Sequence, residues 1–162
     1  MSFTQLILYD EEFKKINDVI TKLYSETNSK VIFLVDRNGQ LIASTGETEN
    51  LDTTSLASLT AGNIAATGSI AKLLGEKEFT IIFHEGYRDN IYISIVGRRV
   101  IMVVIFDERS SLGLVRLRAK KAGEDLTVIF DNLMKKLESK TAEGASPFAE
   151  ITDEDIDRLF SE

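Results

Sequence analysis

The stretch Val-Ile-Met-Val-Val-Ile-Phe at residues 100–106 carries no polar side chain. A strand that is apolar on both faces is typical of the centre of a sheet that is covered on both sides. We therefore expect helices on both faces of a sheet in which this strand is central. Two further strand-like runs, 79–84 and 91–96, precede it, and turn residues at 87–90 and 97–99 separate the three.

A second group of strands lies nearer the N-terminus. The runs 30–36 and 40–44 flank the pair Asn38-Gly39. Asn-Gly is the pair that most readily supplies the positive φ angles of a tight hairpin turn. The sequence therefore predicts a β-hairpin here and five strands in all.

Three helices are predicted from apolar residues that recur at spacings of three and four. The first begins at the cap Asp10, the second runs from about Thr53 to Gly75, and the last begins at Ser110 or Ser111 and ends near Glu138. The apolar stripe of the first is Phe13, Ile16, Ile20 and Leu23, and that of the last is Leu112, Val115, Ala119, Ala122, Leu126, Ile129, Leu133 and Leu137.

These elements follow the order α-β-β-α-β-β-β-α, which predicts an α+β sandwich with a five-stranded, mostly antiparallel sheet between helical layers. The chain has 162 residues, 43% of them hydrophobic, a size typical of one domain. The charge is unevenly distributed along the chain. Residues 138–162 hold eight of the 26 acidic side chains but only two of the 19 basic ones. We expect a folded domain at 1–138, a flexible linker at 139–150 and a short acidic helix at 151–162.

The second helix lacks charge from residue 53 to residue 71. A helix that is uncharged all round is normally hidden from water on both sides. We expect its bulky side (Leu56, Leu59, Ile70 and Leu73 or Leu74) to face its own sheet. The other side is then predicted to be a protein interface, because small side chains let another backbone approach closely; it carries Ala57, Thr60, Ala61, Ile64, Ala65 and Gly68. The alternative is a helix fully buried within its own chain.

The acidic tail carries a helix start, with Thr152 as cap, Asp155 in the capping-box position and Ile151 and Ile156 as the hydrophobic pair. Its apolar face holds Ile156, Leu159 and Phe160. Because so short a helix is marginal alone in water, we expect it to fold on a partner. The alternative is a solvated acidic tail.

Composition excludes several classes of function. The chain has no cysteine and one histidine, His84, so disulfides, Cys-ligated metals and His-His metal sites are excluded. Phosphate-loop, dinucleotide and nucleophile-elbow motifs are missing. We predict no catalytic residue, cofactor or metal, and a cytoplasmic protein that is not inserted in a membrane. The net charge of −7 disfavours nucleic acid as a partner.

One basic patch stands apart from this acidic balance: Arg116, Arg118, Lys120 and Lys121 on the last helix. Surface aromatic residues, which would indicate RNA binding, are not interleaved with it. We expect it to bind either an acidic partner or the acidic tail of the same chain.

Three stretches, 33–42, 52–63 and 111–118, resemble the Roadblock/light-chain-seven (LC7) family, and the resemblance covers essentially the whole chain. The tail segments 146–151 and 157–162 also resemble the bacterial members that regulate a small Ras-like GTPase. The resemblance implies a homodimer in which second helices and sheet edges pair, and which binds one MglA-type GTPase, the carrier of the nucleotide.

The resemblance also implies stimulation of GTP hydrolysis without an arginine finger, a second contact by Ile156, Leu159 and Phe160 that promotes nucleotide exchange, and a role in cell polarity and motility. Other polarity proteins as partners and concentration at a cell pole are implied as well. Two alternatives are a Roadblock scaffold that docks a GTPase without activating it and a small-molecule sensor, which would need a polar internal cavity.

Overall fold

The computed structural model describes residues 10–142 and contains the predicted five strands in one antiparallel sheet, with the strand order β2-β1-β5-β4-β3. The predicted α-β-β-α-β-β-β-α order is confirmed. The elements are α2 (Asp10–Thr27), β1 (Val31–Asp36), β2 (Leu41–Gly46), α3 (Thr53–Leu73), β3 (Ile81–Glu85), β4 (Asn90–Val96), β5 (Val100–Phe106) and α4 (Leu112–Ala142).

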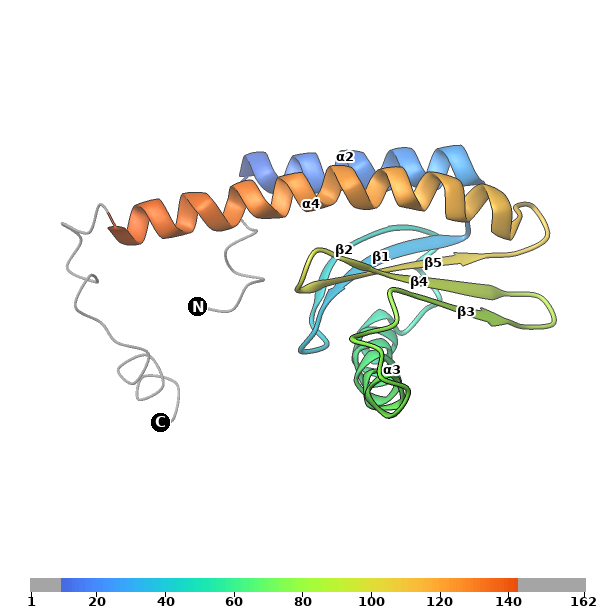
Figure 1. The fold of residues 1–162 in the computed structure, drawn as a ribbon. Coiled ribbons are helices and arrows are strands. Elements are labelled where there is room, and N and C mark those ends of the chain that lie inside the picture. The colour runs from blue at the N-terminus through green and yellow to red at the C-terminus, as the bar shows by residue number, and fades with distance from the viewer. Residues whose placement is uncertain (1–9, 143–162) are drawn as a thin grey trace.

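The sheet lies between two helical layers (Figure 1). Helices α2 and α4 pack side by side on one face, and α3 covers the other. Every residue of β1 and of β5 is buried, as expected for strands that are apolar on both faces. Alternate residues of β1 therefore enter different cores: Ile32 and Leu34 pack with α2 and α4, whereas Val31 and Phe33 pack with α3.

The β1–β2 hairpin confirms the predicted turn, although only one residue of its Asn-Gly pair takes a positive φ. Gly39 has φ of 90°. The buried Asp36 organises the turn, because its Oδ1 accepts hydrogen bonds from the backbone N–H groups of Asn38 (2.9 Å) and Gln40 (3.0 Å). The register of the two strands shifts between Leu34 and Val35.

Helix α4 begins as predicted, with the Ser111 hydroxyl accepting a hydrogen bond from the Leu114 backbone N–H (3.2 Å). It continues to Ala142, four residues beyond the predicted end. The first residues of the predicted 139–150 linker are therefore helical. The predicted tail helix at 151–162 lies outside the described residues.

An ion pair joins the two helices of the α2/α4 layer far from the sheet centre. Lys136 on α4 donates a hydrogen bond to the side chain of Glu12 in the first turns of α2, and Glu12 is only 7% exposed. This hydrogen bond holds the pKa of Glu12 below its usual value, and the pKa of Lys136 is raised by the same contact.

We expect Glu12→Gln to destabilise the protein at neutral pH and to lose this effect in acid. Because the folded-state pKa of Glu12 is depressed, its contribution is complete above the unfolded-state value of 4.5 and is lost as the pH falls through the folded-state pKa. Urea unfolding of the variant and the parent at several pH values measures this. Glu108→Gln, at an exposed loop position, is the control, and a Glu12 effect that persists at low pH contradicts the assignment.

A substitution at Gly46, at the end of β2, tests how closely the sheet edge packs against α2. It has φ of 102°, and a Cβ there would lie 2.5 Å from the Lys30 carbonyl oxygen and 2.9 Å from the Tyr24 ring. Gly46→Ala is expected to cost about 2–4 kcal/mol in the free energy of unfolding. Gly62→Ala in α3 meets no atom within 4 Å and is expected to stabilise the helix by up to about 1 kcal/mol. Urea denaturation compares the two.

Candidate interaction surface

Helix α3, whose one charged residue is Lys72 in its last turn, is fixed at both ends by its own sequence. Asp52 caps it, because Oδ1 accepts a hydrogen bond from the Ser55 backbone N–H (3.0 Å) and Oδ2 accepts one from the Ser55 hydroxyl (2.6 Å). These two hydrogen bonds lower the pKa of Asp52. After the C-cap at Leu74, Gly75 takes a φ of 79° and turns the chain toward β3.

The side of α3 that packs on the sheet is the side with the smaller residues. Ala57, Thr60, Ile64 and Ala71 are buried. Ala57 and Ile64 share a core with Phe33 and other side chains of β1, β4 and β5. The assignment of Ala57, Thr60 and Ile64 to an interface surface is therefore wrong for the folded monomer, because the chain's own sheet covers them.

Four bulky side chains on or next to α3 point into solvent instead. The exposed fractions are 71% for Leu59, 50% for Ile70, 87% for Leu73 and 68% for Leu74. The prediction that these four residues face the sheet is wrong, and the two sides of the helix are exchanged at most positions. Leu56 is the exception, because it is partly buried and packs against the sheet core as predicted. Of the other predicted interface residues, Ala65 is exposed and Ala61 and Gly68 are half-buried.

The sheet itself explains the exchange. Its α3-facing side already carries large side chains, among them Phe33, Ile101 and Val103, so a helix lying on it needs small ones. The hairpin turn comes close as well: a Cβ on Gly39 would lie 3.2 Å from the Ser58 Cα and 3.6 Å from the Ala61 Cβ. The small residues do admit another backbone, but it is the backbone of the same chain.

Two hydroxyl groups in the second half of α3 bond to carbonyl groups of the same helix. Thr67 donates to the Asn63 carbonyl (2.9 Å) and Ser69 donates to the Ala65 carbonyl (3.4 Å). With no charged residue from 53 to 71, the exposed side of α3 is apolar enough to favour contact with another protein. We call the four residues Leu59, Ile70, Leu73 and Leu74 the α3 patch.

A groove of about 280 Å³ opens between α3 and the sheet, next to Leu59 of this patch. Asn63 and His84 from opposite walls approach to 3.5 Å across it (Nδ2 to Nε2), and the buried Asn63 Oδ1 has no hydrogen-bond partner in the described structure. The groove fits an apolar side chain accompanied by a hydrogen-bond donor. It is lined by Phe33, Leu56, Leu59, Thr60, Asn63, His84, Ile91, Ile93, Val103 and Ile105.

Strand β3 forms one edge of the sheet, so its outer backbone groups are available for pairing. Ile81 and Phe83 on this strand are 43% and 36% exposed, and the Phe83 ring stacks on Phe106 with centroids 6.1 Å apart. The predicted pairing of sheet edges thus has an open strand to use.

The basic patch lies away from the α3 patch. Its four residues, Arg116, Arg118, Lys120 and Lys121, are exposed on α4, across the sheet from α3. The predicted tail contacts Ile156, Leu159 and Phe160 lie outside the described residues.

The described part of the chain meets the requirements of neither a metal site nor a membrane-spanning helix. Between residues 10 and 142, no group of three or more His, Asp or Glu side chains is arranged to hold a metal ion. In the same range, no helix combines the length and apolar character needed to cross a membrane.

The α3 faces can be tested with two isoleucines on the same helix. Ile64→Ala removes a buried side chain and should cost about 2–4 kcal/mol in the free energy of unfolding. Ile70→Ala removes a half-exposed one and should cost less than about 1 kcal/mol. Urea unfolding should be measured at protein concentrations where stability no longer depends on concentration, and a larger cost at Ile70 would contradict the observed faces.

Known proteins share this architecture. The family model of the Roadblock/LC7 domain matches residues 15–106 of this chain. MglB of Myxococcus xanthus is 63% identical with a TM-score of 0.75, and the match covers 78% of this chain and 95% of that one. A gliding protein MglB from Thermus thermophilus is 34% identical (TM-score 0.74, 77% and 95%). An MglB with a tetrameric arrangement is 33% identical (TM-score 0.74, 78% and 95%). No curated protein sequence matches. The chain therefore belongs to the Roadblock/LC7 family, among its MglB proteins.

Proposed function

We propose that this protein is a homodimeric regulator of an MglA-type small GTPase that stimulates GTP hydrolysis without a catalytic residue of its own. The observation that carries the proposal is the α3 patch, four bulky apolar side chains exposed on or next to a helix that has no charged residue from 53 to 71. Exposed apolar side chains gathered in this way mark contact with another protein. The 63% identity to MglB of Myxococcus xanthus supports the same assignment.

The dimer is proposed to form through the β3 edge and the α3 helices. Backbone pairing of two β3 strands would continue the sheet from one protomer into the next. The two α3 helices would then lie next to each other, and Ala61, Ala65 and Gly68 would flank the joint surface that receives the GTPase. The tetrameric arrangement named for a relative supports self-association.

The proposed mechanism is selection of an active conformation of the GTPase. An inserted arginine finger is worth about 10³–10⁵ in rate, but residues 53–71 of this chain offer no cation for that role. The transition-state charge would therefore be stabilised by groups of the GTPase itself. A regulator acts in this way when it binds the hydrolysis-competent conformation more tightly than the others.

The tail completes the proposal. Ile156, Leu159 and Phe160 would contact the GTPase away from its nucleotide and promote exchange, with the acidic residues of the tail steering the encounter. A role in polarity and gliding motility agrees with the description of the Thermus thermophilus relative as a gliding protein. Concentration at a cell pole and contact with further polarity proteins remain predictions.

The test is single-turnover GTP hydrolysis by the cognate GTPase with and without the full chain. We expect the parent protein to accelerate hydrolysis at least tenfold. Leu73→Asp should reduce the acceleration at least tenfold, because it places a charge in the apolar contact. Leu117→Asp is the matched control, since Leu117 is a 65% exposed leucine on α4, across the sheet; it should change the rate less than twofold.

Two outcomes would count against the proposal. Binding of the GTPase with an unchanged hydrolysis rate would identify the alternative, a scaffold that docks the GTPase without activating it. Equal losses in Leu73→Asp and Leu117→Asp would show that the α3 patch is not the contact. Circular dichroism and urea unfolding of both variants establish that neither change acts through the fold.

A further inference from the structure

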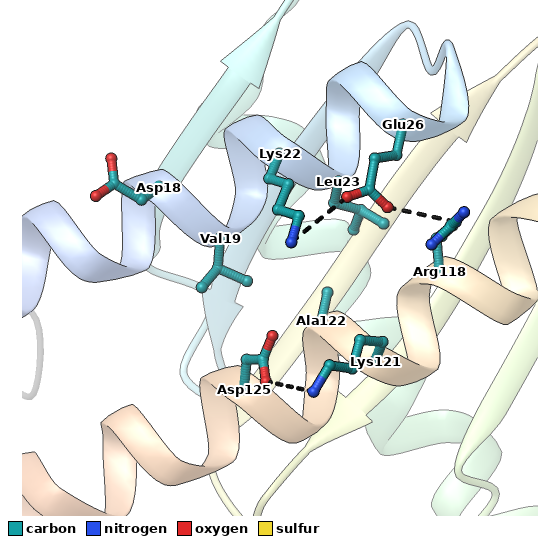
Figure 2. A pocket seen from close by; sticks show the side chains of 9 residues that line it. All are labelled: Asp18, Val19, Lys22, Leu23, Glu26, Arg118, Lys121, Ala122 and Asp125. Carbon is teal, nitrogen blue, oxygen red and sulfur yellow. Dashed lines mark ion pairs between the residues drawn. The ribbon is translucent and has the colours of Figure 1, made fainter.

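The α2/α4 layer has a groove on its outer surface, across the sheet from α3. Its volume is about 380 Å³, and α2 and α4 contribute its two walls (Figure 2). Val19 and Leu23 of α2 and Ala122 of α4 give it an apolar base, where the small Ala122 leaves room between the helices. The lining residues are Asp18, Val19, Lys22, Leu23, Glu26, Arg118, Lys121, Ala122 and Asp125.

The rim of this groove is charged, but its ion pairs are open to solvent. Glu26 forms ion pairs with Arg118 (3.3 Å) and with Lys22 (3.7 Å), and Lys121 forms one with Asp125 (3.2 Å) (Figure 2). The side chain of Lys121 is 71% exposed and that of Arg118 49%. Exposed pairs of this kind contribute about 0–1 kcal/mol each. A ligand with its own charges can therefore exchange partners with them at little cost.

Positive charge accumulates toward the N-terminal end of the groove. From Leu112 to Lys121, α4 carries Arg116, Arg118, Lys120 and Lys121 and no acidic residue. The side chains of this basic patch are exposed. The rim itself holds three acidic and three basic side chains, so the excess of positive charge comes from the adjoining basic patch. An apolar base beside this basic patch is complementary to an amphipathic helix that has apolar residues on one face and carboxylates around them.

The same chain contains such a segment. Twenty residues follow Ala142, and they include seven acidic side chains and one basic one. The predicted tail helix at 151–162 places Ile156, Leu159 and Phe160 on one face. Its carboxylates Asp153, Glu154 and Asp155 directly precede these apolar residues in the sequence, and Asp157 lies between Ile156 and Leu159.

The connecting length matches the distance to the groove. Residues 143–150 span up to about 27 Å when extended, which equals the rise of about 18 residues of α-helix. Residue 151 can therefore lie alongside α4 as far back as about residue 124. A twelve-residue helix adds about 18 Å and would run antiparallel to α4 over the groove and the basic patch. With a more compact connection of about 16 Å, the helix would still cover the groove.

We propose that the α2/α4 groove is the docking site for residues 151–162 of the same chain. Ile156, Leu159 and Phe160 face the apolar base, and the acidic side chains pair with Lys121, Arg118 and their basic neighbours. Docking withdraws the three apolar residues from every other partner. The tail is then held by its own domain until a competing surface releases it, which goes beyond the proposed GTPase contact and does not depend on it.

Disulfide trapping in the full chain tests this placement, because the protein has no cysteine of its own. Val19→Cys in the groove is combined with Leu159→Cys, and the rate of bond formation under mild oxidation is followed by gel mobility. The matched control combines Ser58→Cys, an exposed position on α3, with Leu159→Cys. We expect the first pair to close within one chain at least tenfold faster than the control.

Charge-reversal variants distinguish specific docking of the tail from chance encounters between the two cysteines. Lys121→Glu should slow trapping of the Val19→Cys and Leu159→Cys pair at least threefold, and Asp157→Lys should restore the rate when it is added to Lys121→Glu. Lys72→Glu on α3 is the control and should leave the rate unchanged, whereas 0.5 M NaCl should slow trapping.

Three results would overturn the proposal. The first is equal trapping rates at the groove and at Ser58. The second is a product with twice the chain mass, which would place the tail on a second copy. The third is a rate that Lys121→Glu leaves unchanged. Since the measurement contains no GTPase, its failure leaves the proposed function standing, and failure of GTPase activation leaves this proposal standing.

Discussion

The structure depends on two neighbouring strands, β1 and β5, that are buried on both faces along their whole length. A backbone with apolar side chains on both sides is stable only when both sides are covered. The sheet must therefore lie in the middle of the molecule, and helices from distant parts of the chain must meet it from two directions. Alternation along β1 assigns Ile32 to one core and Phe33 to the other.

The two helical layers meet the sheet in different ways. On one face, α2 and α4 pack side by side with large apolar side chains such as Ile16, Ile20 and Leu126. On the other, α3 is the one helix within residues 10–142, and it lies close to the sheet through Ala57 and Ile64. One helix cannot bury all its sides against a sheet, so Leu59 and Leu73 remain in solvent. The fold thus produces a surface fit for another protein as a consequence of having one helix where the other face has two.

Charge separates the two faces as clearly as packing does. The α3 side has a helix without charge from residue 53 to residue 71, which favours an apolar contact, whereas the α2/α4 side has exposed ion pairs and the basic patch. An acidic segment is attracted to the α2/α4 side, whereas residues 53–71 on the α3 side offer it no cation. A domain that serves as a platform on one face can therefore hold its own tail on the other.

The sequence by itself determined the strands, the order of the elements and the starts of α3 and α4, because these follow from local periods of 2 and 3.6 residues and, for α4, from the cap Ser111. It also showed that α3 has no charged residue from 53 to 71. Only the tertiary structure decided which side of α3 meets the sheet. With no charged residue to mark a solvent side, the choice fell to fit: the crowded face of β1, β5 and β4 and the close approach of the Gly39 turn accept Ala57 and Ala61. Leucines at 59 and 73 do not fit there, and steric fit between segments distant in the chain cannot be read from either segment alone.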